Sequence, residues 1–444
     1  MKKFFQTLQN IWKVEELRTR ILVTLGLILV FRIGSFIVLP GVNAGVLAEA
    51  AQNADQGGLA GLLSLLSGGA FSNASILALG IMPYISASII MQLLGMAVPA
   101  VQKMQNEGES GRNKINNYTR ILTIVICAFQ APSYIGLYVK GINGSIVNET
   151  PLWWVQSVTL LIAGTMFAMW LGERITDKGI GNGISLLITV GILANLPLSF
   201  IQEVTNKSDN PIMIIVELVL FMVIVMATVL IVQGVRKVPM SVAKRMAGGR
   251  TGVAEQGARQ YLPIKVNASG VMPIIFAQAI MTLPLMLIQQ SESGSNFWGL
   301  GDMYGFSYNL VMFFLIIIFT YFYTAIMINP KKMADDMKRN GSFIPGVKPG
   351  VATAEYLDQL ISRITLPGSI FLGLIAIIPA FAKVAGVTDG FAMFYGGTSL
   401  LIMVAVVLDT LQQIESYLLN RHYDGLMEGT RVRGRRTQGE MSGI

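Results

Sequence analysis

Apolar residues occur along the chain in long runs, separated by shorter segments that hold most of the charges. A run of roughly 20 mainly apolar residues is long enough to cross the hydrocarbon of a membrane as a helix. Ten runs satisfy this criterion within a few residues: 21–39, 75–98, 118–139, 152–172, 183–201, 211–232, 270–290, 308–328, 366–383 and 392–410. The pattern predicts an all-α polytopic membrane protein with ten transmembrane helices.

The composition points the same way. Of the 444 residues, 53% are apolar and 13% are charged, whereas soluble domains are about 25% charged. The mean hydropathy of +0.58 is too high for a soluble protein. The single cysteine, Cys127, excludes an intramolecular disulfide, and the single histidine, His422, excludes a metal site built from several histidines.

The basic residues predict the orientation in the membrane. If the N-terminus is cytoplasmic, 29 of the 33 Lys and Arg residues fall on the cytoplasmic side and three fall outside. The remaining one, Arg32, lies within the first span. Because positive charge accumulates in cytoplasmic loops, we expect both termini on that side and an even number of spans.

Ten spans divide into two groups of five, residues 21–201 and 211–410. Since five is odd, the two groups would have opposite orientations, and inverted repeats of this kind place the working site between them near the midplane. Residues 1–20 combine bases with apolar side chains and predict an amphipathic cytoplasmic helix on the membrane surface. Residues 411–444 form a basic cytoplasmic tail.

Two cytoplasmic loops, residues 233–269 and 329–365, are long and basic. One interpretation is that their charge fixes the topology and attracts anionic lipids. The other is that they form a docking surface for a large cytoplasmic partner, such as one with an exposed RNA backbone. Retention of topology does not explain loops of more than 30 residues, which favours the second interpretation.

Enzyme signatures are missing from the sequence. The chain has no Gly-Lys pair, hence no phosphate-binding loop, and no H-E-x-x-H motif. Gly179, Gly181 and Gly183 open a predicted span without a preceding strand, so they indicate a flexible helix start or close helix packing. We therefore expect neither enzymatic activity nor a cofactor.

Few charged residues lie inside the predicted spans: Arg32 and Glu217 lie within them, and Lys383 and Asp409 lie at span edges. They lie on different helices, whereas an ion-coupled transporter usually gathers such groups near the midplane. A secondary transporter of a small solute is thus the weaker alternative. For Arg32 we expect a neighbouring helix or polar backbone as its partner.

Residues 57–69 contain a short apolar segment of about 10 residues that is bounded by glycines. It is too short to span the membrane. A half-helix that folds back into the membrane is tolerated where it lines or fills a cavity. Two interpretations remain open, namely a movable stopper for a pore and an amphipathic segment on the surface.

Ordered motifs extend over most of the chain. They are Phe31-Arg32-Ile33-Gly34, Leu39-Pro40-Gly41, Leu79-Gly80-Ile81-Met82-Pro83-Tyr84-Ile85-Ser86-Ala87-Ser88, Glu107-Gly108-Glu109-Ser110-Gly111-Arg112, Gly164-Thr165-Met166, Trp170-Leu171-Gly172-Glu173, Gly179-Ile180-Gly181-Asn182-Gly183-Ile184-Ser185, Leu262-Pro263-Ile264-Lys265-Val266-Asn267, Phe322-Tyr323-Thr324-Ala325 and Tyr395-Gly396-Gly397-Thr398-Ser399-Leu400-Leu401-Ile402. With these motifs in a ten-span frame, the sequence closely resembles the SecY/Sec61-alpha family of protein-conducting channels.

The resemblance implies two inverted five-helix halves around a pore that is closed at mid-membrane by an aliphatic ring. Its ring positions correspond to Ile81, Ile85, Ile184, Ile188, Ile275 and Ile402. The folded-back segment, residues 59–72, corresponds to the family's plug, with Leu59, Leu62, Leu63, Leu65, Leu66, Gly68 and Gly69. Such a ring suits varied polypeptides, because it excludes ions by dewetting and offers passing side chains no polar site.

The resemblance also implies a lateral gate between helices 75–98 and 270–290, through which apolar segments reach the lipid. Gln92, Gln130 and Gln278 are expected near it, and we hypothesise that they set the cost of opening. The implied function is to translocate unfolded secretory polypeptides across the bacterial inner membrane and to release membrane helices laterally into it.

The implied partners are the small subunits SecE and SecG, the SecA motor ATPase, the ribosome, signal peptides with their nascent chains, and anionic lipids. Motor and ribosomal RNA would dock on Arg245, Arg250 and the second basic loop. The family usually has arginine before a Pro-Gly pair in that loop, where this chain has Lys348. Lysine keeps the charge but lacks the bidentate fork of arginine.

Overall fold

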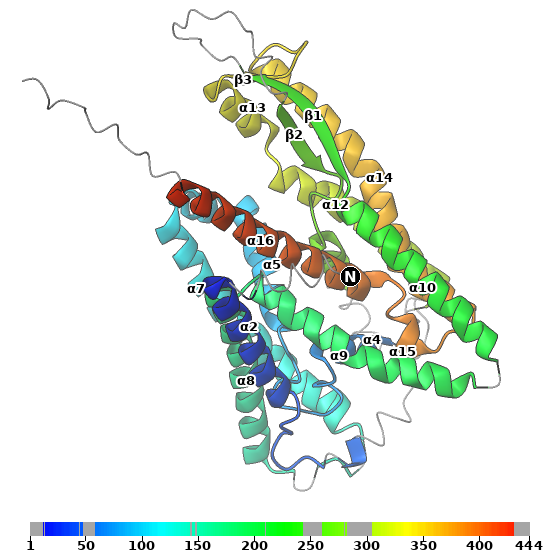
Figure 1. Ribbon diagram of the computed structural model, residues 1–444. Coiled ribbons are helices and arrows are strands. Elements are labelled where there is room, and N and C mark those ends of the chain that lie inside the picture. Colours follow the sequence, from blue (N-terminus) through cyan, green and yellow to red (C-terminus); the bar gives the residue numbers. More distant parts are fainter. Residues whose placement is uncertain are drawn as a thin grey trace, which may run out of the picture.

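The computed structural model describes residues 12, 14–43, 45–47, 58–142, 144–146, 149–208, 210–242, 260–278, 280–281 and 304–429. Helices dominate it (Figure 1). They are α2 (Glu15–Gly34), α4 (Gly58–Ser67), α5 (Met82–Ala97), α6 (Pro99–Asn106), α7 (Glu109–Tyr134) with the π-helical turn η1 (Ile135–Val139), α8 (Pro151–Lys178), α9 (Gly183–Asn206), α10 (Pro211–Val232), α12 (Phe306–Met327), α13 (Pro330–Arg339), α14 (Val351–Val384), α15 (Asp389–Ala392) and α16 (Gly397–Gly429). Residues 272–278 form a further helical segment.

Seven helical segments of the described chain are long and apolar enough to cross a membrane, namely α7 with η1, α8, α9, α10, α12 with α13, α14 and α16. The pair α5–α6, bent by 103°, would make an eighth. The predicted span 21–39 corresponds to α2, whereas residues 282–290 of the predicted span 270–290 lie outside the described residues. The polytopic helical class is confirmed, and the count of ten stays a prediction.

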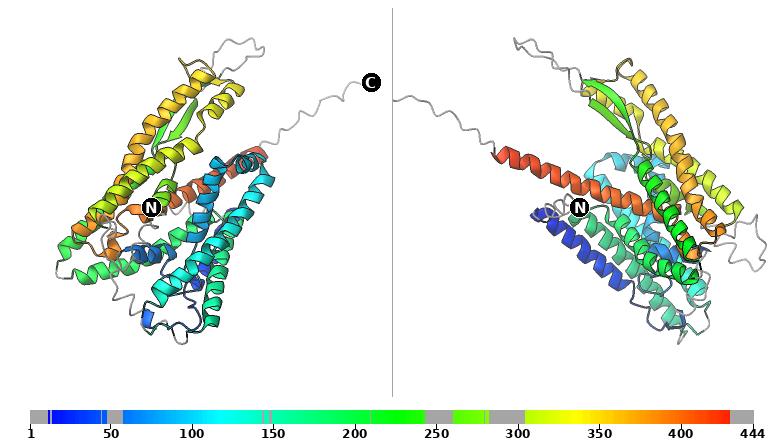
Figure 2. Two further views of the ribbon diagram at one scale, coloured as in Figure 1. Left: turned by 180° about the vertical axis from the view of Figure 1, so that it is seen from behind. Right: turned by 45° about the vertical axis from the view of Figure 1, so that its right-hand side comes forward.

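The helices form two groups (Figures 1 and 2). In the first, α7 packs against α5 and α8, and α2 packs against α8; in the second, α12 packs against α14. α9 contacts α8 and α16, and α16 also contacts α10 and α14, so these two long helices connect the groups. We call α2 to α9 the N-terminal half and α10 to α16 the C-terminal half.

The predicted span 75–98 is helical only in part. Residues 76–81 form turns, in which Gly80 has a φ of +54°, and α5 begins at Met82 with Pro83 in its first turn. Proline suits this position, because its missing N–H would have no partner in the first turn of a helix. The start of this predicted span is therefore wrong by about seven residues.

The two long basic loops fold into one unit (Figure 1). Strand β1 (Val235–Val242) pairs antiparallel with β2 (Gln260–Lys265) and with β3 (Ser342–Phe343), in the order β2-β1-β3. A buried apolar cluster joins this sheet to α13 and α14, and its members are Val238, Ile264, Met337, Ile344, Leu357 and Ile361. The loops therefore have a hydrophobic core of their own.

Helix α14 connects this unit to the rest of the protein. Its 34 residues span about 50 Å, and it begins 15 residues before the predicted span 366–383. The sequence interpretation missed both the sheet and this extension. Figure 2 shows the sheet, α13 and the first part of α14 together at one end of the molecule.

The glycine-rich segment 179–183 starts a helix by close packing. The Asn182 side chain caps α9 by accepting from the N–H groups of Ile184 and Ser185. A Cβ on Gly183 would lie only 2.0 Å from the carbonyl oxygen of Gly172 on α8. Only glycine permits this approach of α9 to α8, which agrees with the packing interpretation of the motif.

Candidate pore and plug

Helix α4 is a ten-residue apolar helix, about 15 Å long, half the thickness of the hydrocarbon. Gly68 and Gly69 follow its last residue, Ser67, and their φ values of +67° and +85° lie in the left-handed region that favours glycine. Among the predicted plug residues, Leu65 and Leu66 are buried and Leu63 is half-buried. The side chains of Leu59 and Leu62 lie outside the described ones.

The predicted ring residues come from four separate segments of the chain. Ile81 and Ile85 lie at the start of α5, Ile184 and Ile188 lie one turn apart on α9, Ile275 lies in the helical segment 272–278, and Ile402 lies on α16. The spacing of four residues places both members of each pair on one helix face.

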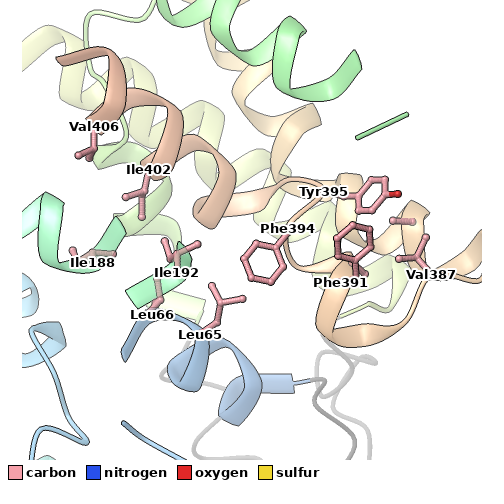
Figure 3. Packing of buried hydrophobic residues seen from close by; sticks show 12 residues of the cluster. Leu65, Leu66, Ile188, Ile192, Val387, Phe391, Phe394, Tyr395, Ile402 and Val406 are labelled. Carbon is pink, nitrogen blue, oxygen red and sulfur yellow. The ribbon is translucent and has the colours of Figure 1, made fainter. Parts of the chain in front are cut away.

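The structure brings these isoleucines together beside the predicted plug. Ile188 and Ile402 are buried in the same apolar cluster as Leu65 and Leu66 (Figure 3). Further members of this cluster are Ile192, Ala382, Val387, Phe391, Ala392, Phe394, Tyr395 and Val406, and Ile85, Ile184 and Ile275 pack against it. We call this group the central cluster.

Ile81 occupies the neighbouring position. It is 5% exposed and belongs to an adjacent cluster with Phe31 and Leu77. Ile85 and Ile184 pack against both clusters, so they connect Ile81 to the others. The six isoleucines therefore form one continuous apolar group.

Polar side chains of the N-terminal half hold the backbone of α4 and of the turn that follows it. Arg32 on α2 donates from Nη1 to the carbonyl oxygen of Gly68 at 2.8 Å. Asn195 on α9 donates to the carbonyl oxygen of Ser64 at 3.3 Å, and the Tyr134 hydroxyl on α7 donates to that of Phe71 at 2.7 Å. Three helices thus fix three successive turns of this segment, and Arg32 has the polar-backbone partner that its sequence position predicts.

The end of α4 also approaches the backbone of α9. A Cβ on Gly68 would lie 2.8 Å from Cα of Gly191 and 2.6 Å from Nη1 of Arg32. A Cβ on Gly191 would lie 2.7 Å from the carbonyl oxygen of Leu66. A side chain at either glycine would push α4 away from α9, so this glycine pair sets how closely α4 approaches α9.

An ion cluster joins the ends of α9 and α10. Nζ of Lys207 lies 2.7 Å from Oε1 of Glu203 and also pairs with the carboxylate of Glu217. The two glutamates are only 1% and 4% exposed, and Glu203 accepts from the N–H of Thr388 at 3.0 Å and from its hydroxyl. Burial lowers the pKa of Lys207, but pairing with both carboxylates outweighs it and holds that pKa above its usual value.

Sequence reasoning missed this cluster. The four-residue spacing of Glu203 and Lys207 on one helix was the signal available in the sequence. Glu217 comes ten residues after Lys207, and only the turn between α9 and α10 brings the two together. Glu217, which the sequence marks as a charge within a span, is therefore part of an ion pair.

The two predicted gate helices meet through apolar side chains. Ile89 on α5 is buried against Phe276 of the segment 272–278, with Tyr323 of α12 beside them. Of the predicted gate glutamines, Gln92 lies on α5 and donates to the Ser88 hydroxyl at 3.4 Å.

The other two predicted gate glutamines lie elsewhere. Gln130 is half-buried on α7. Gln278 is 8% exposed and lines a cavity of about 70 Å³ beside Leu65 and Leu66, with walls from α12 and α14. Gln278 therefore adjoins the predicted plug, and the contact between the gate helices themselves is apolar.

The predicted docking residues are described only in part. Lys348 is exposed in the turn before α14, where its carbonyl oxygen accepts from the Thr353 hydroxyl at 2.9 Å. Arg245 and Arg250 lie outside the described residues. Within the described residues, no group of three or more His, Cys, Asp and Glu side chains could hold a metal ion.

Fold and site define a class of protein, a multi-pass α-helical membrane protein with a short apolar helix packed at its centre. A sequence model of the SecY family matches residues 75–411. The chain belongs to the SecY family.

Relatives and solved structures agree with this assignment. Protein translocase subunit SecY of Vibrio cholerae is 38% identical over 433 residues, covering 95% of this chain and 96% of the relative. That of Streptomyces coelicolor is 40% identical, with coverages of 94% and 98%.

Two solved structures share the fold. A protein-conducting channel matches with a TM-score of 0.64 at 18% identity, and Sec61 in a canine ribosome–channel complex from the endoplasmic reticulum matches with 0.59 at 19%. Both comparisons cover 94% of this chain and 95% of the other.

Proposed function

We propose that this protein is the channel-forming subunit of a protein translocase, which passes unfolded polypeptides across a membrane and releases apolar segments sideways into the lipid. The observation that carries the proposal is the convergence of five isoleucines from four segments on a cluster that includes a short apolar helix, with Ile81 in the adjacent cluster. The names of its relatives, protein translocase subunits, support it.

The chemistry of the central cluster suits this task. An aliphatic constriction resists wetting and so opposes ion passage, while it offers a passing chain no hydrogen-bonding site. α4 acts as the plug, and its leucines fill the space beside the isoleucines. The apolar contact of Ile89 with Phe276 is the lateral gate, since an apolar surface can be replaced by an apolar segment in transit.

The arrangement favours a channel over a small-solute transporter. Three of the four charges named in the predicted spans have structural partners: Arg32 binds the plug backbone, Glu217 pairs with Lys207, and Lys383 pairs with Asp389. Coupled transport needs ionisable groups at a central site, whereas the described centre is built from aliphatic and aromatic side chains.

The partners and the location complete the proposal. The channel itself is no catalyst, and energy comes from the SecA motor, the ribosome or the membrane potential. These partners would dock on the basic unit of β1, β2, β3 and α13, with Lys348 on its surface, while SecE and SecG complete the complex. The distribution of 29 basic residues against three supports a cytoplasmic position for both termini, and the bacterial relatives support the bacterial inner membrane as the location.

Site-specific photocrosslinking tests the proposal. A photoreactive residue replaces Ile81 or Ile275 in cells that produce a stalled secretory chain, and Ile318, 60% exposed on the surface of α12, serves as the control. We expect adducts with the stalled chain at the two ring positions and none at Ile318. Adducts at neither ring position in a functional channel would contradict the proposal.

A further inference from the structure

Arg32 is a charged side chain near the end of α2, within the predicted span 21–39. A cation in a predicted span is costly, because it loses hydration in hydrocarbon, and such residues are retained where they serve a function. Its guanidinium lies 5.3 Å from the ring centroid of Phe36, and its Nη1 donates to the Gly68 carbonyl at 2.8 Å.

The acceptor is the carbonyl of Gly68, which directly follows Ser67, the last residue of α4. The last carbonyl groups of a helix carry the negative end of its dipole, so the Arg32 guanidinium lies beside that end. A cation at this end is stabilising, and a hydrogen bond from an ionised donor is roughly twice as strong as a neutral one. Arg32 therefore makes the strongest kind of contact that a side chain can offer to the end of the plug helix.

The surroundings of Gly68 allow this hydrogen bond only when α4 lies in one position. Arg32 and Gly191 approach Gly68 so closely that no Cβ fits. The hydrogen bonds from Asn195 and Tyr134 are made by neutral side chains and reach residues four before and three after Gly68. Arg32 is the charged member of this set.

We propose that Arg32 is the positioning residue of the plug, which holds α4 in the closed channel through the charge-assisted bond to the Gly68 carbonyl. The inference rests on the proposed function of α4 as the plug. Loss of the guanidinium frees the end of α4, and the closed channel then conducts ions.

Ion flux through the resting channel tests the inference. The complex is purified with its partner subunits and reconstituted into liposomes that contain a chloride-sensitive dye. Because bonds to charged groups contribute more than neutral ones, we expect Arg32→Met to raise the flux by about tenfold. Arg32→Lys keeps a cation within reach and restores most of the closure. Arg174→Met, at a half-buried arginine beside Trp170, is the matched control and leaves the flux unchanged.

A variant that lacks residues 59–72 separates the two ideas. If this variant leaks and Arg32→Met, assembled normally, does not, Arg32 has no positioning role. If neither leaks, the plug function itself is wrong. Should Arg32→Met fail to assemble, Arg32→Gln decides, because it keeps a polar side chain but removes the charge that strengthens the bond to the Gly68 carbonyl: a raised flux supports the inference, and a wild-type flux overturns it.

Discussion

The plug has two different faces. Toward the N-terminal half, its backbone accepts hydrogen bonds from α2, α7 and α9, and Gly68 touches Gly191. Toward the C-terminal half, Leu65 and Leu66 pack among aromatic and aliphatic side chains such as Phe394 and Ile402 (Figure 3). The first face combines apolar contacts, such as Leu63 against the cluster of Tyr134, with directional hydrogen bonds, whereas the second face is held by apolar burial.

The difference separates positioning from closure. A hydrogen bond requires one geometry, whereas apolar burial is non-directional and tolerates sliding. We therefore expect the plug to keep its place on the N-terminal half when the halves separate, and to lose its contacts with the C-terminal half first. Such a plug opens at little cost in broken hydrogen bonds.

The largest expected effect is a loss of stability when the ion cluster at the ends of α9 and α10 is broken. Lys207→Met leaves Glu203 and Glu217 buried without a counter-charge, and removal of one partner of a buried pair costs about 3–5 kcal/mol. Glu203 also binds Thr388, which precedes the plug-contacting segment 391–395. Thermal unfolding of the purified complex measures the loss of stability.

Lys140→Met is the matched control for Lys207→Met. Lys140 pairs with Glu149 at 2.6 Å, but both side chains are largely exposed. Water solvates the remaining carboxylate, so we expect almost no change. Equal effects of the two substitutions would contradict the structural role given to the Lys207 cluster.

The second prediction compares two leucines of α4. Leu66 is buried in the central cluster, whereas Leu63 is half-buried against a cluster of the N-terminal half that includes Phe71 and Tyr134. Leu66→Ala removes buried contacts at a cost of about 2–5 kcal/mol and leaves a cavity on the closing face. We expect a larger ion flux for Leu66→Ala than for Leu63→Ala in the liposome assay. The reverse order would contradict the view that the contacts of α4 with the central cluster close the channel.

The third prediction concerns the backbone contact. Gly191→Val inserts side-chain atoms where the Leu66 carbonyl lies, and overpacking of this kind costs about 1–3 kcal/mol. We expect α4 to shift and the resting flux to rise. Gly26→Val, on α2 with nothing within 4 Å of the added Cβ, is the control. A wild-type flux in Gly191→Val would show that α4 does not depend on this contact.

The smallest expected effect concerns the gate. Gln278→Leu replaces a buried amide beside the plug, and Gln92→Leu removes the bond to Ser88. A net hydrogen bond contributes about 1 kcal/mol, so we expect a change of severalfold in the export of proteins with weakened signal sequences. Unchanged signal selection in both variants would count against a role of these glutamines in gating.

Hydropathy was enough to predict most of the helices. The runs that became α8, α10 and α12 are uninterrupted, and their helical form follows from the need to pair every backbone group in lipid. The sheet was missed because β1 carries Arg236 and Lys237 and lacks a clean alternation, and because its partner β3 comes about 100 residues later. The start of α14 was missed because residues 351–365 carry charges and lie outside the apolar run.

The site was less accessible to sequence reasoning. The short helix between glycines was recognisable from its length, and Arg32 from its charge. The isoleucines differ in no way from other membrane isoleucines, so only the family resemblance singled them out. The bond from Arg32 to Gly68 joins residues 36 positions apart, and no local pattern marks it.

Distances between spin labels would show which half of the protein the plug stays with when the channel opens. With Cys127 replaced by serine, one label is placed on the plug at Leu63 and the second either at Val155 on α8 or at Phe306 on α12, both exposed. A synthetic signal peptide is then added to the reconstituted complex. We expect the distance from Leu63 to Val155 to stay constant and the distance from Leu63 to Phe306 to lengthen. A constant distance to Phe306 with a longer one to Val155 would contradict this expectation.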